Sequence, residues 1–186
     1  MTQSNSLSAD HIPLANEGVE PAAGAHLVRR LVTAVNADGR SYFAEDSRAP
    51  HMTVIAGNPS FVATDLWRTT QTPVQNAGPA DDGLSEPVGI EAPLDGSLFR
   101  VVEFPPDAHF GDGVDLKALM HHRTPSLDYA IVLSGEIWAV LDSDERLMQP
   151  GDVAIQRGTA HSWSNRSQAP AMVAFIMIGG TAEPGS

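Results

Sequence analysis

The sequence predicts an all-β protein built as a sandwich or barrel. Short segments rich in β-branched and aromatic residues recur along the chain, with turn signals between them. The 186 residues include 14 prolines and 16 glycines, which is more typical of a turn-rich β protein than of a helical bundle. Because no segment has the length and periodicity of an ordinary helix, we expect strands to form nearly all of the regular structure.

The N-terminal part of the chain predicts a tail followed by a hairpin. Residues 1–24 are polar with scattered Gly, Pro and Ala, and we expect a mobile tail. The segment HLVRRLVTAV (26–35) has a mixed pattern that fits a short helix or a strand. Asp38 and Gly39 form a turn signal, and SYFAED (41–46) after them alternates, so a hairpin is expected here.

Two more strands and a long loop follow before the main domain. HMTVIAG (51–57) and FVATDLWRT (61–69) are strand candidates. The Pro/Gly/Asp-rich segment 71–89 predicts a long surface loop, which is also a candidate lid or partner contact. We therefore expect residues 25–96 to add strands and a loop that pack on a barrel formed by residues 97–180.

The barrel segment carries the clearest strand signals. In chain order these are LFRVVEF (98–104), DYAIVLSG (128–135), EIWAVLD (136–142), RLMQ (146–149), VAIQ (153–156), HSWSN (161–165) and MVAFIMI (172–178). In the strand that begins at Asp128, both faces are largely apolar, so we expect cover on both sides. A small closed barrel within a homodimer would provide it.

Charge and composition exclude several classes of function. The formal net charge is -12, and such a surface repels phosphate backbones and anionic lipids, so neither nucleic acid nor membrane is expected as a partner. There are no cysteines, so a metal would be held by nitrogen and oxygen ligands. The N-terminus lacks a secretory pattern, and the apolar run APAMVAFIMIGG is too short to span a bilayer, which predicts a cytoplasmic protein.

Two strands begin with residues suited to metal binding or proton transfer. Strand alternation places Asp128 on the same face as Ala130 and Val132, and a carboxylate on a buried strand must be paired, hydrogen-bonded or bound to metal. His161 begins a second buried strand and is a candidate partner. A structural role is the alternative for each: Asp128 could cap the turn near Ser126, and His161 could bond a backbone carbonyl.

The segment GDVAIQRGTAHSWSN resembles the second sequence motif of the cupin superfamily. The match runs from Gly151 through Gly158 and His161 to Asn165, with Arg157 at a position where proline is common. The first motif of that family normally has two histidines, then a glutamate, then a glycine. Counting back from Gly135 places Asp128 at the glutamate position.

The same count places His122 at the first histidine of that motif and Thr124 at the second. The chain therefore departs from the family pattern twice, with Thr124 for a histidine and Asp128 for the glutamate. His121 would take the place of the missing ligand only if the strand shifted by one residue, which would turn its side chain to the other face. The resemblance covers roughly residues 97–179.

The resemblance implies a cupin-type double-stranded β-helix, or jelly-roll, barrel with an N-terminal strand extension. It also implies a divalent metal ion inside the barrel, with His122, Asp128 and His161 as ligands. Two imidazoles and one carboxylate suit Fe, Mn, Ni or Zn, with positions left open for a substrate. The departures in the first motif leave open whether the ion has been lost.

Other polar residues near the motifs are candidates for contacts with a small-molecule ligand. Gln156 and Thr124 are expected to orient the substrate as catalytic residues. Arg123 and Arg157 flank the motifs and could each bind a substrate carboxylate, with a surface ion pair as the alternative. Trp163 could line the pocket, although core packing is the first interpretation.

Two classes of function fit these residues. The first is a metal-dependent cupin enzyme that acts on a small organic acid or a cyclic oxygenated metabolite, as a decarboxylase, lyase, isomerase, cyclase or dioxygenase. The second is a non-catalytic cupin that has lost its metal and serves as a ligand-binding or dimerisation module.

Overall fold

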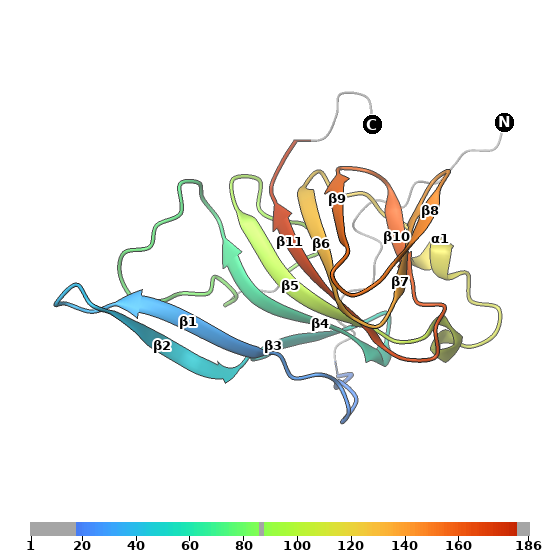
Figure 1. Cartoon of the computed structure of the whole chain (residues 1–186), viewed down its shortest axis with the longest axis horizontal. Helices are drawn as coiled ribbons and strands as arrows, with labels where there is room; N and C mark the ends of the chain where they lie inside the picture. The colour runs from blue at the N-terminus through green and yellow to red at the C-terminus, as the bar shows by residue number, and fades with distance from the viewer. Residues whose placement is uncertain (1–17, 86–87, 182–186) are drawn as a thin grey trace.

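The computed structural model describes residues 18–85 and 88–181, and it folds into two facing β-sheets with a projecting hairpin (Figure 1). The strands are β1 (Arg29–Val35), β2 (Ser41–Arg48), β3 (His51–Ile55), β4 (Asn58–Thr69), β5 (Ser97–Phe104), β6 (Leu127–Ser134), β7 (Ile137–Leu141), β8 (Glu145–Met148), β9 (Val153–Arg157), β10 (His161–Ser164) and β11 (Ala171–Ile178). Two short helical turns, η2 (Asp107–Phe110) and α1 (Leu116–Met120), lie between β5 and β6. The predicted all-β class is confirmed.

The two sheets are antiparallel and differ in size. The larger sheet has the order β3-β4-β5-β11-β6-β9, and the smaller one has the order β10-β7-β8. An isolated antiparallel bridge between His122 and His161 joins the segment before β6 to strand β10. Sequence neighbours such as β6 and β7 therefore lie in opposite sheets, as expected of a jelly roll.

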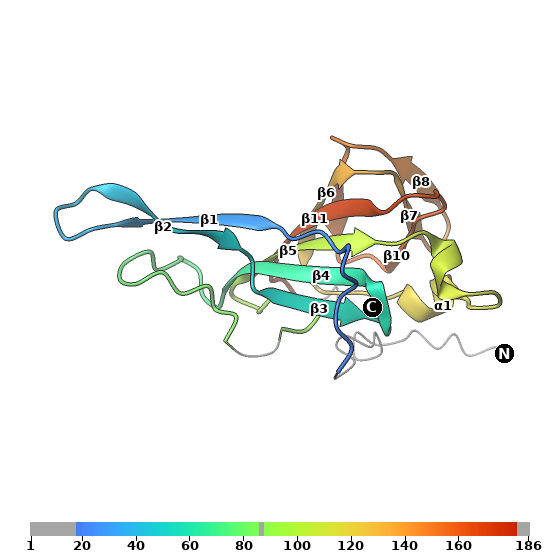
Figure 2. The ribbon, with the colours of Figure 1, turned by 90° about the horizontal axis from the view of Figure 1, so that it is seen from below.

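Strands β1 and β2 form the predicted hairpin, so the segment that fitted either a helix or a strand is a strand. The hairpin is a separate two-stranded sheet that extends away from the barrel (Figures 1 and 2). Its Asn36 side chain accepts hydrogen bonds from the backbone N–H groups of Asp38 and Arg40, which closes the turn. At the base, Arg30 forms ion pairs with Glu45 and Asp82.

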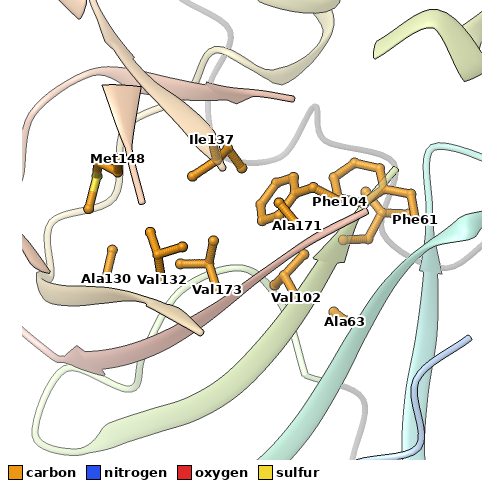
Figure 3. Packing of buried hydrophobic residues seen from close by; sticks show 11 residues of the cluster. Phe61, Ala63, Val102, Phe104, Ala130, Val132, Ile137, Met148, Ala171 and Val173 are labelled. Carbon is orange, nitrogen blue, oxygen red and sulfur yellow. The ribbon is translucent and has the colours of Figure 1, made fainter. Parts of the chain in front are cut away.

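The main hydrophobic core lies between the two sheets (Figure 3). Side chains from the inner face of the large sheet, such as Ala130, Val132 and Val173, pack against Ile137 and Met148 of the small sheet. All five are almost fully buried. Close packing here holds the sheets at a fixed separation, and the polar residues of the same face lie farther along the strands.

The outer face of β6 is less covered than its apolar sequence predicts. Tyr129 and Ile131 are partly exposed, and Leu133 is 47% exposed. Ala49, which follows the hairpin, covers part of this outer face in a cluster with Val101 and Ala174. The cover expected on both sides is thus incomplete within one chain.

The domain boundaries expected from the sequence stay predictions. Most of the expected tail, residues 1–17, lies outside the described residues, as do residues 86–87 of the expected loop. The described part of that loop has no strand or helix. Within residues 18–85 and 88–181, no helix is long and apolar enough to cross a membrane.

Candidate functional site

A cavity of about 80 Å³ lies between the two sheets at the end of the core where the strands carry polar residues. Most of its lining is apolar, with Phe61, Phe104 and Phe175 among the contributors. Its charged or titratable lining residues are Arg100, His122, Asp128 and His161. A mostly apolar cavity with a few converging polar groups is the usual form of a small-molecule site.

His122 and His161 face each other because their backbones pair directly. The N–H of each residue donates to the carbonyl of the other, at 2.9 and 2.8 Å. The two imidazole rings lie with their centroids 4.2 Å apart at an interplanar angle of 55°. Two residues that are 39 positions apart in sequence are thereby held as one pair.

Backbone carbonyls fix the protonation pattern of both rings. Nδ1 of His122 lies 2.8 Å from the carbonyl oxygen of Met120, and Nδ1 of His161 lies 2.9 Å from that of Thr159. A carbonyl only accepts, so each Nδ1 must carry the hydrogen and donate it. In the neutral ring, Nε2 then keeps its lone pair for an ion or another donor.

Burial keeps this pair of imidazoles neutral. Removal from water, reinforced by the neighbouring His122, lowers the pKa of His161 to about 3. Burial likewise lowers the pKa of His122 below its ordinary value. Neutral imidazole is the form that binds metal ions, so the pair is prepared for that role at neutral pH.

Asp128 is the third polar residue of the site, and it is only half satisfied. Its Oδ2 lies 3.5 Å from the Thr124 hydroxyl and 3.2 Å from Nε2 of Gln156. Its Oδ1 is buried and has no hydrogen-bond partner among the described residues. Burial raises the pKa of the carboxyl, with hydrogen bonds from Ser126 and other neighbours opposing the shift. A free oxygen in this position is available to a ligand, a proton or an ion.

Gln156 connects the carboxylate to the histidine pair. Strand pairing places it opposite Asp128, and its Nε2 lies 2.8 Å from Nδ1 and 3.0 Å from Nε2 of His161. The hydrogen on Nδ1 goes to the carbonyl of Thr159, so Nε2 is the acceptor for the amide. Gln156 therefore donates to both Asp128 and His161, and it holds them in one hydrogen-bonded chain.

The donor set fits a divalent ion in part. Two unprotonated Nε2 atoms and one unpartnered carboxylate oxygen are the ligand types that such ions take from proteins without cysteine. Among residues 18–85 and 88–181, however, no three His, Asp or Glu side chains gather closely enough to hold an ion. The histidine pair supplies two of the ligands, although an ion at Nε2 of His161 would have to displace the Gln156 amide, and Asp128 would complete the set only by moving closer.

The remaining predicted residues occupy different places. Gln156, Arg157 and Trp163 line an adjacent open cleft of about 720 Å³ between β7, β8 and β9, and Trp163 also lines the smaller cavity. Arg157 is exposed. Arg123 is also exposed, and it lines neither space among the described residues. The structure thus places four predicted residues around the cavity, namely His122, Asp128, His161 and Trp163, with Gln156 and Thr124 bonded to Asp128. Arg157 lies outside the cavity and Arg123 apart from it.

One lining residue was missed by the sequence reasoning. Arg100 lies on the inner face of β5, is only 6% exposed, and forms an ion pair with Asp65 of β4 at 2.8 Å. The signal was present, because LFRVVEF places a cation at the centre of an apolar strand. A charge buried in such a strand needs a partner, as the neighbouring strand's aspartate provides.

The motif residues outside the cavity are explained by turn geometry. Gly135 has a φ of 71°, and a Cβ atom there would lie 2.6 Å from the carbonyl oxygen of Pro170. Only glycine fits such a position. The Asn165 side chain donates to the carbonyls of Phe104 and Ala169, at 3.0 and 2.8 Å. These residues therefore shape the barrel end and do not contact the cavity.

Comparison with known proteins agrees with this fold. Cupin-domain-containing oxidoreductase fogC of Aspergillus ruber is 34% identical over 165 residues, which cover 85% of this chain and 75% of that protein. Cupin-domain-containing oxidoreductase virC of Hypocrea virens is 36% identical over 149 residues, or 78% of this chain and 71% of that protein. Phomopsin biosynthesis cluster protein C' of Diaporthe leptostromiformis is 41% identical over 145 residues, or 74% of this chain and 70% of that protein.

No protein-family model matches the sequence. The identity to these relatives nevertheless extends over most of both chains. This chain belongs to the cupin superfamily, and the resemblance seen in the motifs is confirmed.

Proposed function

We propose that this protein is a cupin enzyme that oxidises or reduces a small organic molecule, with a divalent metal ion held by Nε2 of His122 and Nε2 of His161. The observation that carries the proposal is the neutral histidine pair, with each Nδ1 hydrogen fixed to a backbone carbonyl. Relatives named cupin-domain-containing oxidoreductases support redox chemistry over decarboxylase, lyase, isomerase or cyclase chemistry.

A bound Fe, Mn, Ni or Zn ion would supply a Lewis acid, and iron would add access to dioxygen chemistry. The chain itself supplies the remaining functions. Asp128 Oδ1 is free to take a proton or to approach as a third ligand. Gln156 orients Asp128 through its amide, and Thr124 supports the same carboxylate oxygen.

The size of the two spaces indicates how a substrate would bind. The cavity of about 80 Å³ is far below the roughly 300–1,000 Å³ of a typical ligand pocket, so it admits only one end of a molecule. The cleft of about 720 Å³ is in that range. Trp163 lines both, which supports a substrate with its body in the cleft and its reacting end beside the histidines.

A relative from a phomopsin biosynthesis cluster supports a role in small-molecule biosynthesis. This agrees with a small organic acid or cyclic oxygenated metabolite as substrate. A cytoplasmic location stays a prediction of the sequence.

The second candidate is a non-catalytic cupin that binds a small ligand without metal. The amide of Gln156 favours it, because this group already donates to Nε2 of His161 and to Asp128. A metal ion would have to displace that bond.

Metal content separates the two candidates. Protein purified without a His-tag is analysed for Fe, Mn, Ni and Zn, before and after loading with each ion. We expect close to one ion per chain in the wild type and a background level in His161→Ala. His109→Ala removes an exposed histidine outside the site and serves as the matched control, with wild-type metal content. If the wild-type protein cannot be loaded with any of the four ions, the metal-dependent enzyme is contradicted and the ligand-binding cupin is retained.

We also propose that the chain forms a homodimer through the outer face of its large sheet. Leu133, Val153 and Ile155 are 47%, 53% and 56% exposed on neighbouring strands, and exposed apolar patches of this kind mark protein contacts. Sedimentation velocity should give twice the chain mass for the wild type and the chain mass for Leu133→Glu, because Leu133 lies outside the cleft that Val153 and Ile155 line. A monomeric wild type would contradict the dimer.

A further inference from the structure

Arg100 is the one cation that lines the cavity among the described residues. It lies on β5, opposite Phe175 of β11 on one side and Asp65 of β4 on the other. Arg100 is 6% exposed and Asp65 is 4% exposed, so both charges are almost removed from water. An arginine in this environment needs an opposite charge beside it, which Asp65 provides.

Two of its three nitrogens are used by the protein. Nε donates to Asp65 Oδ1 at 2.8 Å, and Nη2 donates to the carbonyl oxygen of Gly89 at 2.9 Å while lying 2.8 Å from the same carboxylate oxygen. Nη1 makes no hydrogen bond to any residue in the described ranges. A guanidinium has five N–H donors, and two of them belong to Nη1.

A purely structural role of Arg100 in joining neighbouring segments does not require Nη1. The edge formed by Nε and Nη2 already joins β5 to β4 and to the loop at Gly89. Nη1 belongs to a side chain that lines the same cavity as His122, Asp128 and His161. A charged donor that has no protein partner binds an acceptor strongly when one arrives.

We propose that Arg100 binds the anionic group of the substrate, a carboxylate, through Nη1 inside the cavity. The inference rests on the proposed function, because it names the chemical class of the molecule that reaches the histidine pair. The cavity volume admits a carboxylate, and the body of the molecule continues toward the cleft beside Trp163.

Arg100 replaces Arg123 and Arg157 as the residue that selects an acid. The latter two are exposed, where water screens their charge and weakens any ion pair. Arg100 is enclosed by protein, so its charge acts at short range through a low dielectric. The pocket would therefore distinguish a carboxylic acid from its neutral amide of the same shape.

The experiment uses butyrate as the probe and butyramide as its neutral counterpart, with protein from which metal has been removed. Calorimetry gives the dissociation constants, and the Nε–H resonance of Arg100 is followed by NMR during the same titrations. We expect butyrate, but not butyramide, to bind and to shift that resonance.

The variant must lose Arg100 without leaving Asp65 as an unpaired buried charge. The double variant Arg100→Met with Asp65→Leu removes both charges together, and such replacements are well tolerated in protein interiors. Loss of a charge-assisted hydrogen bond should weaken butyrate binding by about tenfold to a hundredfold. Circular dichroism of the double variant checks that it folds.

The control removes another arginine–aspartate pair, which is exposed and lies outside the cavity. Arg29 and Asp46 lie 2.7 Å apart in the hairpin, and Arg29→Met with Asp46→Leu should leave butyrate affinity unchanged. Equal binding of butyrate and butyramide, wild-type affinity in the Arg100 double variant, or loss of affinity in Arg157→Ala would each overturn the inference.

The outcome is separable from that of the metal experiment. Butyrate binding is measured on metal-free protein, so its result does not depend on whether the histidine pair holds an ion. If butyrate binding depends on Arg100 but the protein cannot be loaded with metal, the proposed metal site is contradicted and the role of Arg100 stands. Metal binding together with a butyrate affinity that does not depend on Arg100 would contradict the carboxylate contact of Arg100 and leave the proposed metal site standing.

Discussion

The inner face of the large sheet has an apolar end and a polar end, and the same strands build both. In β6, Ala130 and Val132 belong to the sealed core, whereas Asp128 on the same face reaches the cavity. In β9, Ala154 packs against the core, whereas Gln156 bonds to Asp128. Alternation along a strand determines on which face of the sheet a side chain lies. Its position along the strand determines whether it lies in the core or at the site.

Strand β5 repeats this division. Val102 and Phe104 belong to the hydrophobic core (Figure 3), and Arg100 on the same face is paired with Asp65. The two ends depend on different forces. The apolar end is stabilised by packing, so removing one methyl group lowers the free energy of unfolding by a small amount. The polar end is stabilised by paired groups, so removing one partner leaves the other buried and unpaired, at a larger cost.

The largest expected effect is at the polar end. Asp65→Ala leaves the buried charge of Arg100 without its carboxylate, and we expect the free energy of unfolding to fall by about 3–5 kcal/mol. Chemical denaturation of the metal-free protein measures it. In the double variant Asp65→Leu with Arg100→Met, the free energy of unfolding should return most of the way to the wild-type value. A double variant as unstable as Asp65→Ala would contradict the pairing.

Acid should weaken the same end through the histidines. The pKa of His161 is lowered to about 3 in the folded chain from an ordinary 6.5, so between these values the unfolded chain binds a proton that the folded chain does not. The free energy of unfolding should therefore fall with decreasing pH in this range, by about 1 kcal/mol per pH unit.

The neighbouring groups modify this slope in known directions. The lowered pKa of His122 adds to it. The raised pKa of Asp128 opposes it, because that carboxyl binds its proton more readily when folded. Denaturation of metal-free wild type and His161→Gln across the range tests the assignment, and an equally steep slope in His161→Gln would refute it.

The apolar end should respond more mildly to a single methyl group. Ile137 is fully buried between the sheets, and Ile137→Val should lower the free energy of unfolding by about 0.5–1.5 kcal/mol. Metal content and butyrate affinity should not change, because the cavity is lined by other residues. A change in either quantity would show that the two ends are coupled.

The smallest effect is expected for His121, the neighbour of a site residue. Its Nε2 lies 2.8 Å from Asp142, whose side chain is 72% exposed, and surface pairs of this kind contribute about 0–1 kcal/mol. His121→Ala should therefore keep both its stability and its metal content close to wild type. A loss of metal comparable with that of His161→Ala would mean that His121 belongs to the site.

Most of the strands could be predicted from the sequence, because their period and turn residues are local signals. Spacing to Gly135 and the pattern ending at Asn165 were sufficient to select His122, Asp128 and His161 as candidates. The structure brings these residues to one cavity together with Trp163, and Thr124 and Gln156 bond to Asp128. Their roles in binding metal or substrate stay predictions.

Exposure was harder to predict than residue type. Arg123 and Arg157 lie next to the motifs, yet both are exposed, whereas Arg100 is distant in sequence and lines the cavity. Adjacency to a motif says nothing of the direction in which a long side chain extends. The outer face of β6 shows the same difficulty, since Leu133 is apolar but remains 47% exposed in the single chain.

The sequence by itself determined the all-β class, the hairpin, the barrel strands and the cupin motifs, because each depends on residues close together in the chain. Only the tertiary structure decided which groups share a cavity. His122 and His161 pair through their backbones, Gln156 joins Asp128 across neighbouring strands, and Arg100 meets Asp65 of β4. Contacts between strands distant in sequence follow from sheet order and register, which no local pattern records.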